Sequence, residues 1–171
     1  MKKILRLFPA DSNFPKLFEK EKVRLEKIIG SENSIEHVGS TAVPGLGGKG
    51  IIDIAIGVPN FADISAVAGK LMQHGYFPDL DHEPSADWEW FFLASREHNS
   101  TLGDYHLHIT VKNGNEWKRL LLFRDSLRNN PNLRNKYMKL KKELLIATGA
   151  DREKYKKSKN DFIESVLKGE K

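Results

Sequence analysis

The sequence predicts an α+β fold, in which a small mixed β-sheet has helices on one face and a helical C-terminal extension. Up to about residue 113, runs of β-branched and aromatic residues alternate with segments of helical periodicity. From residue 114 onward, apolar residues recur only at helical spacing. Because 171 residues is the usual size of one domain, we expect residues 1–171 to form a single unit, with the sheet in about 1–113 and the C-terminal helices in about 114–171.

Five helices are predicted from stripes of apolar side chains at helical spacing. The first two are followed by Gly30 and Gly75, residues that commonly end helices, and the fourth follows Pro131. The stripes of the last two helices include Tyr137 and Tyr155. The predicted helices are residues 13–29, 62–74, 116–128, 133–148 and 151–167.

Four strands are predicted from short runs rich in β-branched and aromatic residues. The first two are joined by TAVPGLGGKG, whose glycines and proline indicate a loop, and the last two by a polar stretch suited to a hairpin. Trp88, Trp90 and Phe92 alternate in the third strand, a pattern more typical of a core than of a surface that stacks a base. The acidic residues of 79–87 predict a surface loop. The predicted strands are residues 35–38, 51–58, 88–93 and 105–111.

The composition limits the class of protein. The chain is 39% hydrophobic and 30% charged and has no apolar run as long as a membrane span, so we expect a soluble protein with no membrane partner. The basic start MKKILRLFPADS is interrupted by Arg6 and Pro9, unlike a secretory signal. With no cysteine there is neither a disulfide nor a thiolate metal site, and we expect the cytoplasm as the compartment.

The net charge of +5 is unevenly distributed. Residues 112–171 contain 17 Lys/Arg and 8 Asp/Glu, whereas residues 1–111 contain 11 and 15. A basic half beside an acidic half favours an anionic ligand such as a phosphate, a nucleotide or RNA. The alternative is that these lysines form solvated helix faces.

The main functional signal is IEHVGSTAVPGLGGKGIIDIAIGV, residues 35–58. Gly39 lets backbone N–H groups approach an anion, and the hydroxyl of Ser40 can donate to one of its oxygens. Strand alternation puts Asp53 on the face opposite the isoleucines of strand 51–58. In strand 105–111 it likewise puts His106 and His108 on the face opposite the apolar residues. If the apolar faces lie under helices, these three side chains line one cleft.

The run IEHVGSTAVPGLGGKGIIDI resembles the hallmark of the GrpB-like family, a branch of the nucleotidyltransferase superfamily. LLLFRDSLRNNP and the positions of Tyr137, Lys141, Tyr155 and Lys159 also agree, so the resemblance spans nearly the whole chain. It implies a polymerase-β-like nucleotidyltransferase fold with a helical C-terminal extension. It implies no established reaction.

One position departs from the superfamily pattern of two carboxylates on the same strand face. Asp53 is present, but Ala55 occupies the place of the second acid. A single carboxylate holds Mg²⁺ only with help, so we expect Mg²⁺ to bind together with a nucleotide whose phosphates complete the ligands. His106 and His108 are alternative ligands, and imidazoles suit a transition metal better than magnesium.

Roles for the candidate residues follow from these patterns. Asp53, His106 and His108 are the predicted catalytic and metal-binding residues, with a histidine as general base. Arg124 either grips phosphate over the cleft, as the resemblance implies, or pairs internally with Asp125 or another acid. His37 is expected to hydrogen-bond the loop that follows it. The predicted ligand-binding residues are Gly39, Ser40, Thr41, Lys49, Arg124, Lys141 and Lys159.

We therefore expect a nucleotidyltransferase-superfamily protein that binds a nucleotide or another phosphorylated small molecule with a divalent metal and transfers a nucleotidyl group to an acceptor. The first alternative is a non-catalytic ligand-binding or partner-docking module that lost turnover with the acid at Ala55. Domains of this family also occur fused to dephospho-coenzyme A kinase, which supports this alternative. The second alternative is an RNA-binding protein that uses the basic C-terminal helices, with affinity that falls steeply with salt.

Overall fold

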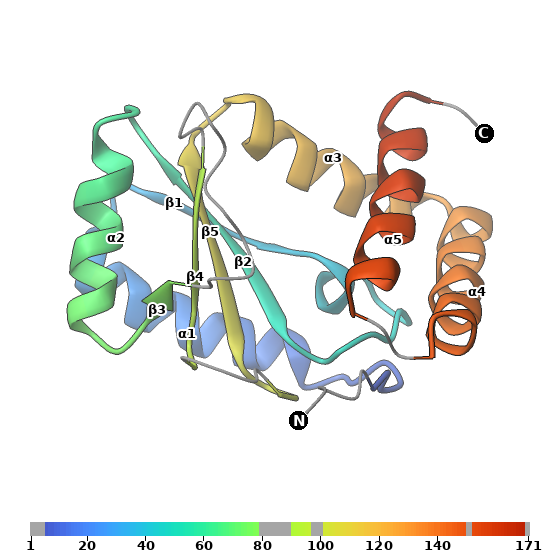
Figure 1. The fold of residues 1–171 in the computed structure, drawn as a ribbon. Helices are drawn as coiled ribbons and strands as arrows, with labels where there is room; N and C mark the ends of the chain where they lie inside the picture. Colours follow the sequence, from blue (N-terminus) through green and yellow to red (C-terminus); the bar gives the residue numbers. More distant parts are fainter. Residues whose placement is uncertain (1–5, 79–89, 97–100, 150–151, 170–171) are drawn as a thin grey trace.

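The computed structural model describes residues 6–78, 90–96, 101–149 and 152–169. A five-stranded mixed sheet runs through its centre in the order β1-β2-β5-β4-β3 (Figure 1). β2 and β5 are parallel, and the other neighbouring pairs are antiparallel. The strands are β1 Ser34–Val38, β2 Ile52–Val58, β3 Phe77–Pro78, β4 Trp90–Ala94 and β5 Tyr105–Val111.

Helices α1, Phe14–Ile29, and α2, Asp63–Gln73, cover one face of the sheet (Figure 1). Their buried residues form one hydrophobic cluster with the alternate isoleucines of β2, which are completely buried. Ala55, between two of these isoleucines, belongs instead to a separate cluster with Trp117, and this alternation of faces confirms the two-residue period read from the sequence. The other face of β2 carries Asp53 at the site and Ala55 in contact with helix α3, Asn115–Asn129.

The helical C-terminal extension consists of α3 Asn115–Asn129, α4 Pro131–Ala147 and α5 Arg152–Leu167. α3 crosses the opposite face of the sheet, where Trp117 packs against Val38 and Ala55. A Cβ at Gly57 would lie 2.7 Å from the Trp117 ring, so only small residues on β2 admit this helix. α4 and α5 pack against the far end of α3 and against the β1–β2 loop.

The observed elements agree with the five helices and four strands that the sequence predicts, within two or three residues at each end. β4 and β5 pair antiparallel, as the predicted hairpin requires. The short strand β3 and the 3₁₀ helix η1, Ser40–Ala42, were not predicted. The loop predicted at 79–87 and the first residues of the strand predicted from 88 lie outside the described residues. None of the helices in the described ranges is long and apolar enough to cross a membrane.

Candidate functional site

The turn between β1 and η1 begins with Gly39, whose φ of +71° is in the left-handed region that favours glycine. A Cβ at this position would collide with the Asp53 carboxylate. The absence of a side chain therefore makes room for Asp53. Ser40 follows on η1, and its Oγ accepts a hydrogen bond of 3.3 Å from Nζ of Lys141.

Asp53, His106 and His108 converge as predicted, because β2 and β5 run parallel with Asp53 opposite His106. The Asp53 Oδ1 lies 3.7 Å from Nδ1 of His106 and 3.6 Å from Nε2 of His108. Burial opposes the ionisation of Asp53, but His108, His106 and Lys49 together outweigh it and lower its pKa to about 2. The carboxylate is therefore ionised at neutral pH. Phe92 of β4 packs edge-on against both imidazoles.

The loop before β2 contributes Lys49 and the backbone beside it. Gly48 forms an isolated bridge with Phe8, with backbone hydrogen bonds of 2.7 and 3.0 Å. The carbonyl of Gly47 accepts a short hydrogen bond from Nζ of Lys141. The segment near the N-terminus and α4 thus hold this loop from both sides.

Helices α4 and α5 each present a tyrosine and a lysine four residues later, in YMKLK and YKKSK. Residues four apart lie on one face of a helix, so Tyr137 and Lys141 face the sheet together, as do Tyr155 and Lys159. The Lys141 Nζ lies 4.7 Å from the centre of the Tyr137 ring, and the lysine is only 2% exposed. Burial, with a smaller effect of the Lys159 charge, lowers the pKa of Lys141 to about 7. Burial and the charge of Lys49 lower the pKa of Lys159 to about 8.

These parts enclose a cavity of about 130 Å³. All the predicted site residues line it, except Gly39 and Arg124. Sequence reasoning missed Tyr137 and Tyr155 as site residues, because their apolar spacing indicated only a helix core. The repeated tyrosine–lysine pair was the signal that identifies them. The lining residues are Ser40, Thr41, Gly48, Lys49, Gly50, Ile51, Asp53, Phe92, His106, His108, Tyr137, Lys141, Tyr155 and Lys159.

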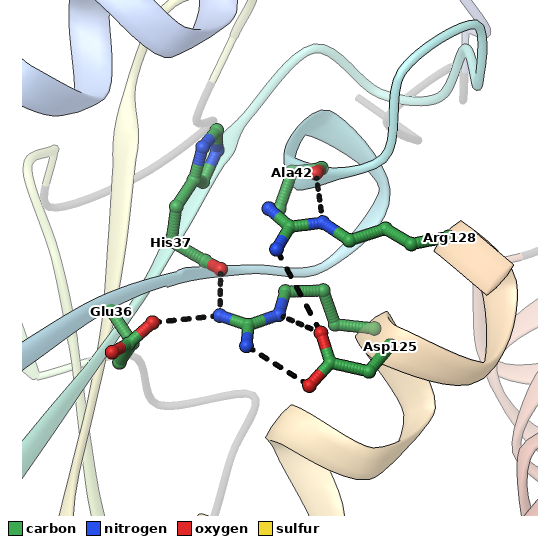
Figure 2. A network of polar contacts seen from close by, with 6 residues as sticks. Glu36, His37, Ala42, Asp125 and Arg128 are labelled. Atoms are coloured by element: carbon green, nitrogen blue, oxygen red, sulfur yellow. Dashed lines mark hydrogen bonds and ion pairs between the residues drawn. The ribbon is translucent and has the colours of Figure 1, made fainter.

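Arg124 does not line the cavity, which corrects its predicted role in gripping phosphate. Its guanidinium donates to Glu36, to Asp125 and to the carbonyl of His37, and its side chain is 9% exposed (Figure 2). The internal pairing considered as the alternative is therefore the correct one. Arg128, one turn later on α3, donates to the Ala42 carbonyl at 2.9 Å. The two arginines fix the backbone on either side of the Gly39–Ser40 turn.

His37 and Phe92 of β4 belong to the core. The His37 Nε2 lies 3.0 Å from Oγ1 of Thr41, so the predicted hydrogen bond to the following loop is confirmed. Its ring stacks on Phe18 of α1, and burial lowers its pKa to about 4. Phe92 is 5% exposed, as expected for a core residue that also forms a wall of the cavity. Trp88 and the side chain of Trp90 lie outside the described part of the chain.

The residues present do not fit a magnesium site of the kind that the fold implies. Mg²⁺ prefers several oxygen ligands, and Asp53 is the one carboxylate that lines the cavity in the described part of the chain. Ala55 is completely buried against α3. In the described ranges no group of three or more His, Asp or Glu side chains is arranged to hold a metal ion.

Comparison with known proteins gives the family. Residues 4–169 match the family described as GrpB protein. The chain belongs to the GrpB family. It is 34% identical over 168 residues to a UPF0157 protein of Halalkalibacterium halodurans, covering 96% of this chain and 81% of that protein. It is 31% identical over 162 residues to the glutamate-rich protein GrpB of Alkalihalophilus pseudofirmus, covering 94% and 92%. A dephospho-CoA kinase of Mycobacterium leprae is 30% identical over 155 residues, which cover 75% of this chain but 37% of the kinase.

Solved structures confirm the fold. The crystal structure of the conserved protein GrpB from Enterococcus faecalis matches with a TM-score of 0.75 at 27% identity, over 95% of this chain and 99% of that one. A cytoplasmic RNA terminal U-transferase matches with a TM-score of 0.51 at 13% identity, over 77% of this chain and 41% of that one. This GrpB-family protein therefore has the nucleotidyltransferase fold that the sequence resemblance implied.

Proposed function

We propose that this protein binds the phosphate end of a nucleotide or of another phosphorylated small molecule in the cavity between the sheet and the C-terminal helices. The observation that carries the proposal is the convergence of Lys49, Lys141 and Lys159 on a cavity that Ser40 also lines. Ammonium groups and a hydroxyl are the donors that phosphate oxygens accept from. The uneven charge of the sequence supports the same class of ligand.

The size of the cavity limits which part of the ligand it holds. Pockets that enclose a whole drug-sized ligand measure roughly 300–1,000 Å³, whereas this cavity measures about 130 Å³. It has room for phosphate groups, so the remainder of the ligand lies outside it. Because the cavity would contact the phosphate groups and not the base, we expect it to bind phosphorylated molecules as a class, without selecting one base.

The Asp53–histidine cluster supplies the chemistry for a transfer reaction at this position. The Asp53 carboxylate lies 3.6 Å from Nε2 of His108 and can hold this ring in the orientation of a general base for an acceptor hydroxyl. A binding role without transfer is the second candidate, because the buried Ala55 replaces an acid that nucleotidyl transfer uses. Turnover, measured beside binding, separates the two.

Calorimetry on the full chain tests the binding proposal, with ATP, GTP, CTP, UTP and dephospho-coenzyme A, each with and without Mg²⁺. We expect at least one of these compounds to bind, and Ser40→Ala to weaken it by roughly tenfold, the loss of one hydrogen bond to a charged group. The exposed Ser65 on α2 gives the matched control, Ser65→Ala, which should bind as the wild type does.

Two results would contradict the proposal. The first is that none of the five compounds binds under either condition. The second is binding of an RNA oligonucleotide with a steep salt dependence and no effect of Ser40→Ala, which would assign the basic helices to RNA instead.

A further inference from the structure

The position of the missing second carboxylate is closed in this structure. Ala55 follows Asp53 by two residues on the same face of β2, and it is completely buried with Val38 and Trp117. A carboxylate there would lie in an apolar contact between β2 and α3, where an unpaired charge is costly. Helix α3 therefore packs at the position where the second carboxylate of a two-carboxylate metal site would lie.

The charge of the cavity has the opposite sign from that of a metal site. Among the described residues, Asp53 is the one acidic side chain in the lining, and it is already close to His106 and His108. Lys49, Lys141 and Lys159 line the same space. Such a site disfavours a divalent cation and favours an anion, since like charges repel and opposite charges attract at these distances.

The two helix lysines differ in how firmly they are held. Nζ of Lys141 is anchored between Ser40, the Gly47 carbonyl and the Tyr137 ring. Within the residues that the structure describes, no hydrogen bond or ion pair engages the Lys159 ammonium, which feels Asp53 only through space. Lys159 therefore has its three N–H donors available to a ligand. The ammonium group of Lys141 is instead held in one position in the cavity lining.

We infer that the cavity neutralises its anionic ligand with the ammonium groups of Lys141 and Lys159, in place of a carboxylate-bound magnesium ion. This inference rests on the proposed phosphate binding and states how the charge is balanced. The lowered pKa values of both lysines agree with it, because an anion between them would relieve the cost of holding buried positive charge. It follows that the ligand binds without a metal.

The experiment uses inorganic pyrophosphate as the probe, titrated calorimetrically into the full-length protein in excess EDTA and again in Mg²⁺. We expect binding in EDTA, and a loss of roughly tenfold or more in Lys141→Met and in Lys159→Met, each of which removes a charge-assisted hydrogen bond. The matched controls are Lys142→Met and Lys157→Met, exposed neighbours on the same two helices, which should bind as the wild type does. Thermal melts of all four variants verify that they are folded.

The possible results are distinct. Pyrophosphate binding only in Mg²⁺ overturns the inference and leaves the proposed function standing. Binding in EDTA that Lys141→Met and Lys159→Met do not weaken also overturns it, because the charge then comes from other groups. Absence of binding by pyrophosphate and by every nucleotide, with and without Mg²⁺, overturns the proposed function itself. If Lys141→Met fails to fold, the half-buried Lys159 decides through Lys159→Met alone.

Discussion

Gly39 and Asp53 share one space: a Cβ on Gly39 would lie 2.9 Å from Cβ of Asp53 and would collide with its carboxylate. The turn that carries Ser40 and the acid that faces the histidines are therefore positioned by each other. We predict that Gly39→Ala destabilises the fold in two ways, by strain at a φ of +71° and by this collision. The free energy of unfolding, measured in urea, should fall by about 2–4 kcal/mol.

Gly45 provides the matched control. Its φ is +76°, but no atom lies within 4 Å of the Cβ it lacks. Gly45→Ala should therefore show the strain alone, about 1 kcal/mol. Equal losses in the two variants would mean that Asp53 simply moves aside. Adding Asp53→Gly to Gly39→Ala should recover the difference between them.

Arg124 is predicted to act as a positioning residue for the turn. Arg124→Met removes donors to Glu36, Asp125 and the His37 carbonyl, and should cost about 2–3 kcal/mol of folding stability. Nucleotide affinity should weaken as well, although Arg124 is outside the cavity. The control is Arg119→Met, which breaks a more exposed pair with Glu164 worth about 0–1 kcal/mol. Loss of stability with unchanged affinity would show that the turn holds its shape without the arginine.

The buried ammonium group of Lys141 is predicted to lower the free energy of unfolding of the protein. Its pKa is about 7 in the folded chain against 10.5 unfolded, so the unfolded state binds more protons between these values and wild-type stability rises with pH through that window. At pH 6 the buried charge carries its full cost, and Lys141→Met should be more stable than wild type by about 1–3 kcal/mol. The gain should shrink toward pH 10. Lower stability of the variant at pH 6 would mean that the contacts with Ser40 and Gly47 outweigh the burial of charge.

Pyrophosphate affinity is predicted to fall as pH rises above 7. The free protein loses the protons of Lys141 near pH 7 and of Lys159 near pH 8, and the anion binds the protonated forms. Each lysine contributes up to about a tenfold loss per pH unit above its pKa. The affinity is measured by calorimetry from pH 6 to pH 9 in wild type and in Lys159→Met. The titration of pyrophosphate itself affects both proteins equally, so it cancels when their pH slopes are compared. A variant slope equal to that of wild type would exclude Lys159 from the binding. The other titratable groups facing this space are Lys49, Asp53, His106, His108, Tyr137 and Tyr155, with Arg119 and Lys156 farther out on the Lys159 side.

The fold and half of the site were predictable because they depend on local periodicity. The two-residue period of β2 and β5 separates Asp53, His106 and His108 from the buried isoleucines, and any sheet that buries the isoleucines must place the three polar residues on its other face. The family resemblance supplied the nucleotidyltransferase fold and the positions of Lys141 and Lys159, but the parallel pairing of β2 and β5 came from the structure. The contact between His37 and Thr41 was also predictable, because the two residues are four positions apart in the sequence.

The remaining features depend on contacts between distant segments, which periodicity does not encode. Arg124 pairs with Glu36, which is 88 positions away in the sequence. The packing of α3 on β1 determines which acid lies within its reach. The need for glycine at residue 39 comes from the side chain of Asp53, on a different strand. Tyr137 belongs both to the core and to the cavity wall, and a stripe of apolar residues shows only the first of these.

The hydrogen bond between Ser40 and Lys141 joins residues 101 positions apart, and Lys159 lies farther along still. During synthesis the turn, Asp53 and both histidines are made before α4 and α5, which complete the cavity. The cavity is therefore incomplete until translation has passed residue 159. Termination between residues 112 and 158 would yield a polypeptide that encodes all five strands of the sheet but lacks Lys159.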